Sequence, residues 1–125
     1  MNRTDAESVA AWEYKHIYYN DDKASMKRKG RLFTILYNSY LPYVNTAYNR
    51  LASLGVAIRE GEFRSMYSEL ILYAVKMWSG SCKFTNYLHT NLLGLSRMAR
   101  KYVSVVGSDK ACYNAPIDDI IAAYA

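Results

Sequence analysis

Cysteine, histidine and long apolar runs are all scarce in this chain of 125 residues. The two cysteines, Cys82 and Cys112, form no CxxC pair and have only two histidines for company, so we expect neither a zinc site nor a disulfide framework. No stretch approaches the roughly 18 apolar residues of a membrane span, and the N-terminus has no apolar secretion signal. We therefore expect a cytoplasmic protein that holds no metal or other cofactor.

The composition indicates one folded domain over residues 1–125. Hydrophobic residues make up 51% of the chain and charged residues 22%, and a second sizeable core does not fit into this length. Sixteen lysines and arginines against eleven acids give a net charge of +5, which favours anionic partners. Thirteen tyrosines against three phenylalanines and two tryptophans favour surfaces that are partly buried and partly wet.

Apolar residues recur at steps of three and four along most of the chain, which is the period of amphipathic helices. The pattern predicts helices over about residues 5–19, over 31–54, from Phe63 to Trp78 and from near Lys83 to Gly107. Pro116 and the following IDDIIAAY predict a short last helix. The predicted fold is an all-α, single-domain bundle of about four helices plus a short C-terminal helix.

The first predicted helix opens with a capping signal. Thr4, with Glu7 three residues later, matches a capping box. The helical period then predicts that one face of this helix carries four large side chains, namely Val9, Trp12, His16 and Tyr19.

The segment that follows is polar and basic. It contains Gly30 and five cations, Lys23, Lys27, Arg28, Lys29 and Arg31. It is either a basic connector or the exposed start of the next helix, and its cations either follow a phosphate backbone or are only solvated. Further along, Pro42 predicts a kink or a break near Leu41, and Gly55 is a natural C-cap.

Sequence motifs of catalysis are absent. The chain contains no GxSxG elbow, HExxH, P-loop or GxGxxG motif. Carboxylates such as Glu60, Glu62 and Glu69 are expected to be solvated on helix surfaces, and His16 and His89 to be packed or surface side chains. We therefore predict that the protein is not an enzyme.

One stretch carries a more specific pattern. Glu62 and Phe63 open a helix that ends on Trp78, a short SGSC loop follows, and KFTNY at 83–87 opens a basic helix. Upstream, YNSYLPYVNTAYNRLA at 37–52 places tyrosine, leucine and proline before apolar residues at helical spacing. Over residues 31–103 the chain resembles region 2 of bacterial sigma factors, especially the small, divergent sigma-like late-transcription factors of tailed phages. Residues 104–125 then form a C-terminal tail.

The resemblance implies a transcription initiation factor that binds bacterial RNA polymerase core and contacts or helps to melt promoter DNA. The outward residues of the helix that ends on Trp78 are then expected to dock on the clamp helices of the polymerase large subunit; they are Glu62, Arg64, Ser65, Ser68, Glu69 and Lys76. The basic helix that begins near Lys83 is expected to face DNA, with Tyr87 stacking an extruded base. Its DNA-binding set is Lys83, Tyr87, His89, Thr90, Asn91, Arg97, Arg100 and Lys101.

The chain departs from the family pattern in both sets. Ser65 and Met66 replace the family's glutamine–glutamate pair on the polymerase-binding helix, and Thr90 and Asn91 replace its tandem aromatic pair. No part of the chain resembles the family's separate helix-turn-helix domain.

Residue spacing alone offers structural explanations for the same side chains. Trp78 and Phe84 follow the apolar stripe and are expected in the core, and core packing explains Tyr87 about as well as a contact with DNA. Arg97, Arg100 and Lys101, near the end of the helix that begins near Lys83, also complement the dipole of that helix.

Other functions stay open at this point. The chain is alternatively a phage helical protein that inhibits host RNA polymerase or another host machine without contacting DNA. A third interpretation is a basic bundle that binds any duplex without polymerase. The C-terminal strip either folds back onto the bundle or binds a further phage protein; its apolar residues are Ile117, Ile120, Ile121 and Tyr124.

Overall fold

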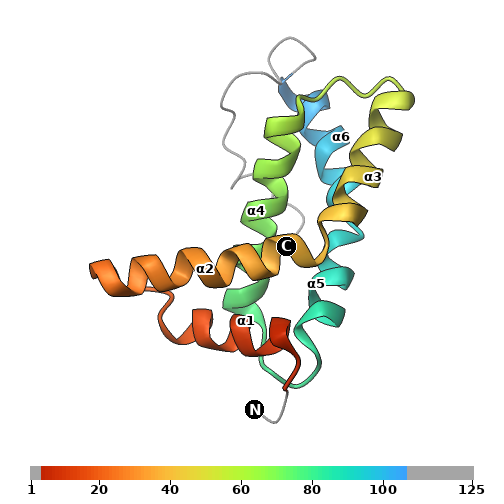
Figure 1. The fold of residues 1–125 in the computed structure, drawn as a ribbon. Coiled ribbons are helices and arrows are strands. Elements are labelled where there is room, and N and C mark those ends of the chain that lie inside the picture. The colour runs from red at the N-terminus through yellow and green to blue at the C-terminus, as the bar shows by residue number, and fades with distance from the viewer. Residues whose placement is uncertain (1–3, 107–125) are drawn as a thin grey trace.

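A computed structural model of the chain describes residues 4–106, and within this range every regular element is a helix. The predicted all-α fold is therefore confirmed. In chain order the helices are α1 (Ala6–His16), α2 (Lys23–Ser39), α3 (Leu41–Ser53), α4 (Glu60–Met77), α5 (Phe84–Leu92) and α6 (Leu95–Val106), as Figure 1 shows.

α4 is the central helix of the bundle. It packs against each of the other five helices, and its buried side chains recur every three or four residues along one broad face. Full burial of a large apolar side chain contributes about 1.5–3 kcal/mol, so this face fixes the positions of the neighbouring helices. The buried residues of α4 are Phe63, Met66, Tyr67, Leu70, Ile71, Ala74 and Val75.

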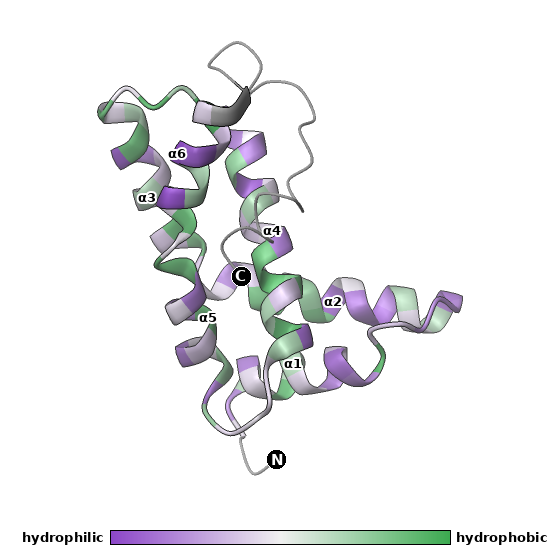
Figure 2. Cartoon of the chain, turned by 180° about the vertical axis from the view of Figure 1, so that it is seen from behind, coloured by the Kyte–Doolittle hydropathy of each residue, from purple (hydrophilic) through white to green (hydrophobic). Residues whose placement is uncertain are grey.

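The other helices fall into two groups around α4. α1 and α2 form an antiparallel pair that crosses α4, and the N-terminal half of α2 projects sideways from the bundle, away from α3, α5 and α6 (Figures 1 and 2). α3, α5 and α6 run alongside α4, with α6 packed on α3 and α5 packed on α1. The basic start of α2 therefore lies beside α1 and away from α3, α5 and α6.

The predicted helix over residues 31–54 is broken at Tyr40, in agreement with the break that Pro42 predicts. α2 ends at Ser39 and α3 begins at Leu41, so Pro42 lies in the first turn of α3. A proline is tolerated there because the first turn of a helix needs no backbone donor from it. The break turns the chain, so that α2 packs on α1 while α3 packs on α4 and α6.

The predicted helix from Lys83 to Gly107 is two helices, so the prediction of one continuous helix is wrong. Leu93 and Gly94 form a turn between α5 and α6, and Gly94 N donates to the Asn91 carbonyl at 3.4 Å. Glycine inside a helix costs about 1 kcal/mol relative to alanine, which makes this position easy to break. The turn lets α5 pack on α1 and α6 pack on α3.

α1 has a different cap from the predicted one. Asp5 is the N-cap, and its Oδ2 accepts a hydrogen bond from Ser8 N at 3.0 Å. The predicted capping box of Thr4 and Glu7 is therefore wrong: threonine and aspartate are both good caps, and here the aspartate forms the bond. The helix ends at His16, three residues before the predicted end.

The predicted apolar face of α1 is also wrong. Val9 is 45% exposed and Tyr19 is 78% exposed, and His16 lies at the surface. Of the four predicted residues, only Trp12 packs against the core, where its ring meets that of Trp78 edge-on at 6.0 Å. Periodicity failed here because the inward face is not built from large residues.

Small residues form the inward face of α1. Ser8, Ala10 and Ala11 are buried, with exposures of 2% or less. Such short side chains let the α1 backbone come close to the start of α5, where the Ser8 hydroxyl accepts a hydrogen bond from the Phe84 N–H at 3.0 Å. This bond satisfies one of the backbone donors that the first turn of α5 leaves unpaired.

The basic segment between the first two predicted helices is largely helical. Asp22 caps α2 by accepting a hydrogen bond from Ser25 N at 3.0 Å, and Lys23 is the first helical residue. Of the two interpretations, the exposed start of a helix is the one confirmed, and Gly30 lies inside α2.

Gly55 ends α3 as predicted. Its φ is 81°, and Gly55 N and Val56 N donate to the carbonyls of Ala52 and Leu51, which is the Schellman pattern. The predicted stop at Gly107 and the predicted helix from Pro116 lie outside the described residues. None of the helices within residues 4–106 is long and apolar enough to cross a membrane.

Candidate polymerase and DNA interfaces

Five of the six predicted polymerase-binding residues share one outward face of α4, opposite its buried side. Ser65 and Lys76 are exposed, and the other three are half-buried. Positions three, four and seven apart on a helix lie on the same side, which brings these residues into line. We call this set the α4 stripe: Glu62, Ser65, Ser68, Glu69 and Lys76.

Arg64, the sixth predicted residue, lies at the side of the stripe and is engaged within the bundle. Its guanidinium donates to Glu60 Oε1 at 2.7 Å and to Asn45 Oδ1 at 3.0 Å. The bond to Glu60 raises the pKa of Arg64. Arg64 therefore ties α4 to α3, and a partner that binds it has to compete with these bonds.

Both ends of the α4 stripe touch neighbouring elements. At one end, the Tyr102 hydroxyl of α6 donates to Glu62 Oε2 at 3.5 Å. At the other end, the Lys76 ammonium lies 6.0 Å from the centroid of the Tyr19 ring, beside an open cavity of about 290 Å³. Lys15 also lines this cavity and donates to the carbonyls of Lys76 and Trp78. Ser65, one turn along the helix from Glu62, is exposed and is accessible to a partner.

The turn between α4 and α5 is held by buried aromatic rings. Trp78 and Phe84 are fully buried and meet edge-on at 5.3 Å, which confirms their predicted core positions. The Trp78 indole donates to the Cys82 carbonyl at 3.1 Å. Gly80, with a φ of 86°, leaves room for the Trp12 ring. The angle between the two helices is therefore fixed by packing.

The predicted DNA-binding residues of α5 lie on different sides of that helix. Phe84, Leu88 and Leu92 face the core. Tyr87 and Asn91 lie on one flank and are half-buried, with Asn91 Nδ2 donating to the Tyr87 carbonyl at 2.9 Å. The Tyr87 ring packs against the core and is still partly exposed, so it is neither sealed inside nor free.

His89 and Thr90 are exposed on the remaining surface of α5, and Lys83 is exposed at its N-cap. Residues two apart on a helix point about 200° apart, which places His89 away from Tyr87. Hydrogen bonding with Ser8 is the main cause of the lowered pKa of Asp5, and the nearby Lys83 ammonium contributes a small part. The α5 residues therefore do not form one surface.

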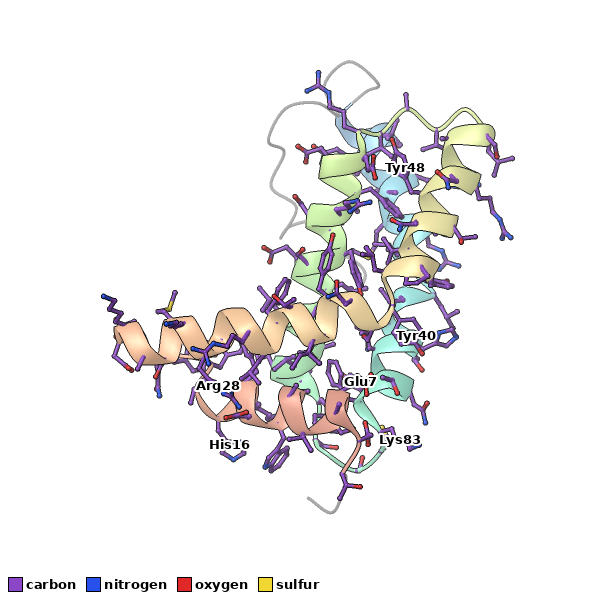
Figure 3. All side chains as sticks on the ribbon, in the orientation of Figure 1. Glu7, His16, Arg28, Tyr40, Tyr48 and Lys83 are labelled. Atoms are coloured by element: carbon purple, nitrogen blue, oxygen red, sulfur yellow. The ribbon has the colours of Figure 1, made fainter. Side chains whose placement is uncertain are left out.

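Sequence reasoning missed an aromatic cluster where α5 meets the joint between α2 and α3. The His89 ring lies 5.6 Å from the Tyr40 ring and 5.8 Å from the Tyr43 ring, and the two tyrosine rings are 6.3 Å apart. Tyr40 lies beside α5 in Figure 3. The one local signal is the pair of tyrosines on either side of Leu41 and Pro42, which says nothing of where His89 will lie.

The cations of α6 form the clearest single surface in the described part of the chain. Arg97, Arg100 and Lys101 are exposed along one side of the helix. The opposite side is buried and consists of Leu95, Met98, Ala99 and Tyr102. No ion pair with a carboxylate within residues 4–106 neutralises the three cations, so this α6 cationic face can bind an anion.

Within residues 4–106, no group of three histidine, cysteine or acidic side chains is placed to hold a metal ion. His16 bonds the Trp12 carbonyl through Nδ1 at 2.8 Å, and His89 belongs to the aromatic cluster. Comparisons with protein-family models, with curated proteins and with solved structures found no match to this chain. The candidate interfaces therefore rest on residue chemistry and geometry.

Proposed function

We propose that the chain is a sigma-like transcription initiation factor that binds bacterial RNA polymerase core and contacts promoter DNA in the host cytoplasm. The α4 stripe is the polymerase-binding surface, and the α6 cationic face contacts phosphates. The proposal assigns no chemical step to the chain itself. The observation that carries it is the α6 cationic face, because three solvated cations without a carboxylate partner in the described range suit a polyanion.

The geometry supports a division of labour between α4 and α6. Both helices bury one side in the same core and present the other side to solvent. A mixed stripe of serines, acids and a lysine suits helix-on-helix docking, where polar groups set the register of the contact. A purely cationic face suits phosphates, which fix position without reading sequence. The chain is then able to hold a polymerase with α4 while α6 touches DNA.

Polymerase binding is tested by mixing the full chain with core enzyme and promoter DNA. We expect co-elution with the core in size-exclusion chromatography and a promoter-specific run-off transcript. Ser65→Arg places a bulky cation at an exposed position of the α4 stripe and is expected to weaken binding at least roughly tenfold, equivalent to about 1.4 kcal/mol. Asn49→Arg adds the same side chain to an exposed position of α3 and serves as the matched control. Absence of co-elution refutes the proposal.

DNA contact is tested with the Arg97→Gln/Arg100→Gln/Lys101→Gln variant in the polymerase complex. Log affinity falls as log salt rises, and each lost phosphate contact on duplex DNA reduces the magnitude of this slope by about 0.9. Three lost contacts therefore reduce the magnitude by about 2.7. Arg50→Gln/Arg59→Gln removes exposed cations from α3 and the start of α4 and is expected to leave the slope unchanged. Polymerase binding without any DNA contact supports the inhibitor interpretation in place of the initiation factor.

Tyr87 has a separate role in the proposal, the capture of an unpaired base. Stacking of a base on an aromatic ring contributes roughly 1–3 kcal/mol. Tyr87→Leu keeps an apolar side chain against the core and removes the aromatic ring. We expect it to keep polymerase binding and to lose promoter opening, measured by permanganate reactivity of unpaired thymines. Unchanged opening assigns Tyr87 to packing alone.

A further inference from the structure

The start of α2 holds the densest positive charge in the described chain. The seventeen residues of this helix include five cations and no acid, and the cations all fall within its first nine positions: Lys23, Lys27, Arg28, Lys29 and Arg31. This half of the helix is also the part that projects from the bundle (Figure 1).

Two of the five cations are bound within the fold. Arg28 forms a bidentate ion pair with Glu13 of α1, with Nε to Oε1 at 2.9 Å and Nη2 to Oε2 at 2.7 Å. The Lys29 ammonium donates to the Tyr18 carbonyl at 3.0 Å. Both bonds join α2 to the end of α1 and the turn after it, so they hold the projecting part of α2 in place. Figure 3 shows Arg28 directed toward α1.

The other three cations form one line on the opposite, solvent-facing side. Lys23, Lys27 and Arg31 are four residues apart, and all three are exposed. A step of four residues raises the helix by about 6 Å and keeps successive side chains on one face. The buried residues of α2, Leu32 and Leu36, lie on the other face. We call this line the α2 basic stripe.

We infer that the α2 basic stripe binds the phosphate backbone of duplex DNA. The stripe presents three evenly spaced cations, and no ion pair with a carboxylate within residues 4–106 neutralises them. An even line of cations on a fixed helix matches an even line of phosphates. The inference rests on the proposed function, in which DNA is a partner, and adds a second DNA contact apart from the α6 cationic face.

Duplex DNA suits this surface better than a membrane or an acidic protein does. An amphipathic helix binds lipid by inserting its apolar face, and the central residues of the apolar face of α2, Leu32 and Leu36, are buried in the bundle. A protein partner usually needs apolar or aromatic anchors at the centre of the contact. Gly30, Thr34 and Asn38 share the face with the three cations and offer none, and the partly exposed side chains of Met26 and Ile35 lie at its two edges.

The test uses the full chain alone, without polymerase, and a short fluorescent duplex whose anisotropy is followed over a series of salt concentrations. Lys27→Gln/Arg31→Gln is expected to weaken binding at low salt roughly tenfold or more. It is also expected to reduce the magnitude of the slope of log affinity against log salt by about 1.8, since each phosphate contact contributes about 0.9. Arg50→Gln/Arg59→Gln removes the same charge from another part of the surface. It is expected to change the slope by less than the value of about 0.9 that one phosphate contact contributes. Circular dichroism of both variants shows whether the helices are kept.

Two results overturn the inference. The first is an equal loss of affinity in both double variants, which means that only net charge matters. The second is wild-type DNA affinity in Lys27→Gln/Arg31→Gln. Wild-type DNA affinity together with a loss of binding to phosphatidylserine vesicles assigns the stripe to a membrane instead. Loss of duplex binding by the stripe variant, in a chain that does not bind polymerase at all, supports this inference and refutes the proposed function instead.

Discussion

α1 and α6 are helices of nearly equal length, 11 and 12 residues, that meet the core in opposite ways. α6 buries large residues such as Leu95 and Tyr102 and keeps its cations outside. α1 buries Ser8 and two alanines and leaves Val9 45% exposed. Size and polarity therefore separate the two faces of α6, whereas α1 combines a close approach of small residues and a buried hydrogen bond with the packing of Trp12 on Trp78.

The largest effect that this comparison predicts is in α6. Leu95→Ala removes a fully buried side chain, and such truncations cost about 2–5 kcal/mol because they lose apolar burial and leave a cavity. The free energy of unfolding in urea measures this loss. Arg97→Gln on the opposite side of the helix is the control and is expected to change stability by no more than about 0.5 kcal/mol. Similar losses in both variants contradict the assignment of the two faces.

A smaller effect is expected in α1, where Ser8→Ala removes the acceptor for the buried Phe84 N–H. An unsatisfied buried donor costs about 1–3 kcal/mol, although alanine fits the space that serine occupies. Urea unfolding again measures the loss. Val9→Ala deletes a larger apolar side chain from the same helix and is expected to cost less, because Val9 is 45% exposed. A greater loss in Val9→Ala shows that α1 is held by apolar burial after all.

The smallest effect concerns the cap of α1. Asp5→Ala is expected to destabilise the fold by about 1 kcal/mol, the usual value for a lost N-cap. Hydrogen bonding with Ser8 lowers the pKa of Asp5 below its ordinary value of 3.8, so its contribution is complete above pH 3.8 and is lost as the pH falls through the lower folded value. Asp5→Asn keeps the acceptor and removes this pH dependence. Acid titrations of unfolding free energy that coincide for wild type and Asp5→Asn contradict this role.

The same contrast explains which parts of the fold could be predicted. The periods of α4 and α6 identify their buried faces because large apolar residues occupy them, and Pro42 marks the break before α3 because its ring removes a backbone donor. The break at Gly94 was missed because the apolar period continues across it. Whether a glycine inside such a pattern breaks the helix depends on what the two halves pack against.

The candidate interfaces were predictable to different degrees. The α6 cationic face and the α4 stripe follow from helical spacing, since residues three and four apart share a side. The engagement of Arg64 with Asn45 and the meeting of His89 with Tyr40 were not predictable, because they join residues far apart in the sequence. The division of the basic segment into two bound cations and three free ones likewise depends on where α1 lies.

The central claim is that the α4 stripe binds RNA polymerase, and site-specific photo-cross-linking tests it most directly. A benzophenone amino acid at Ser65 lies at an exposed position of the stripe, and one at Asn49 of α3 lies on another exposed surface. With core polymerase, we predict a strong cross-link from position 65 to the large subunit and little or none from position 49. No cross-link from position 65, or equal cross-links from both, contradicts the account.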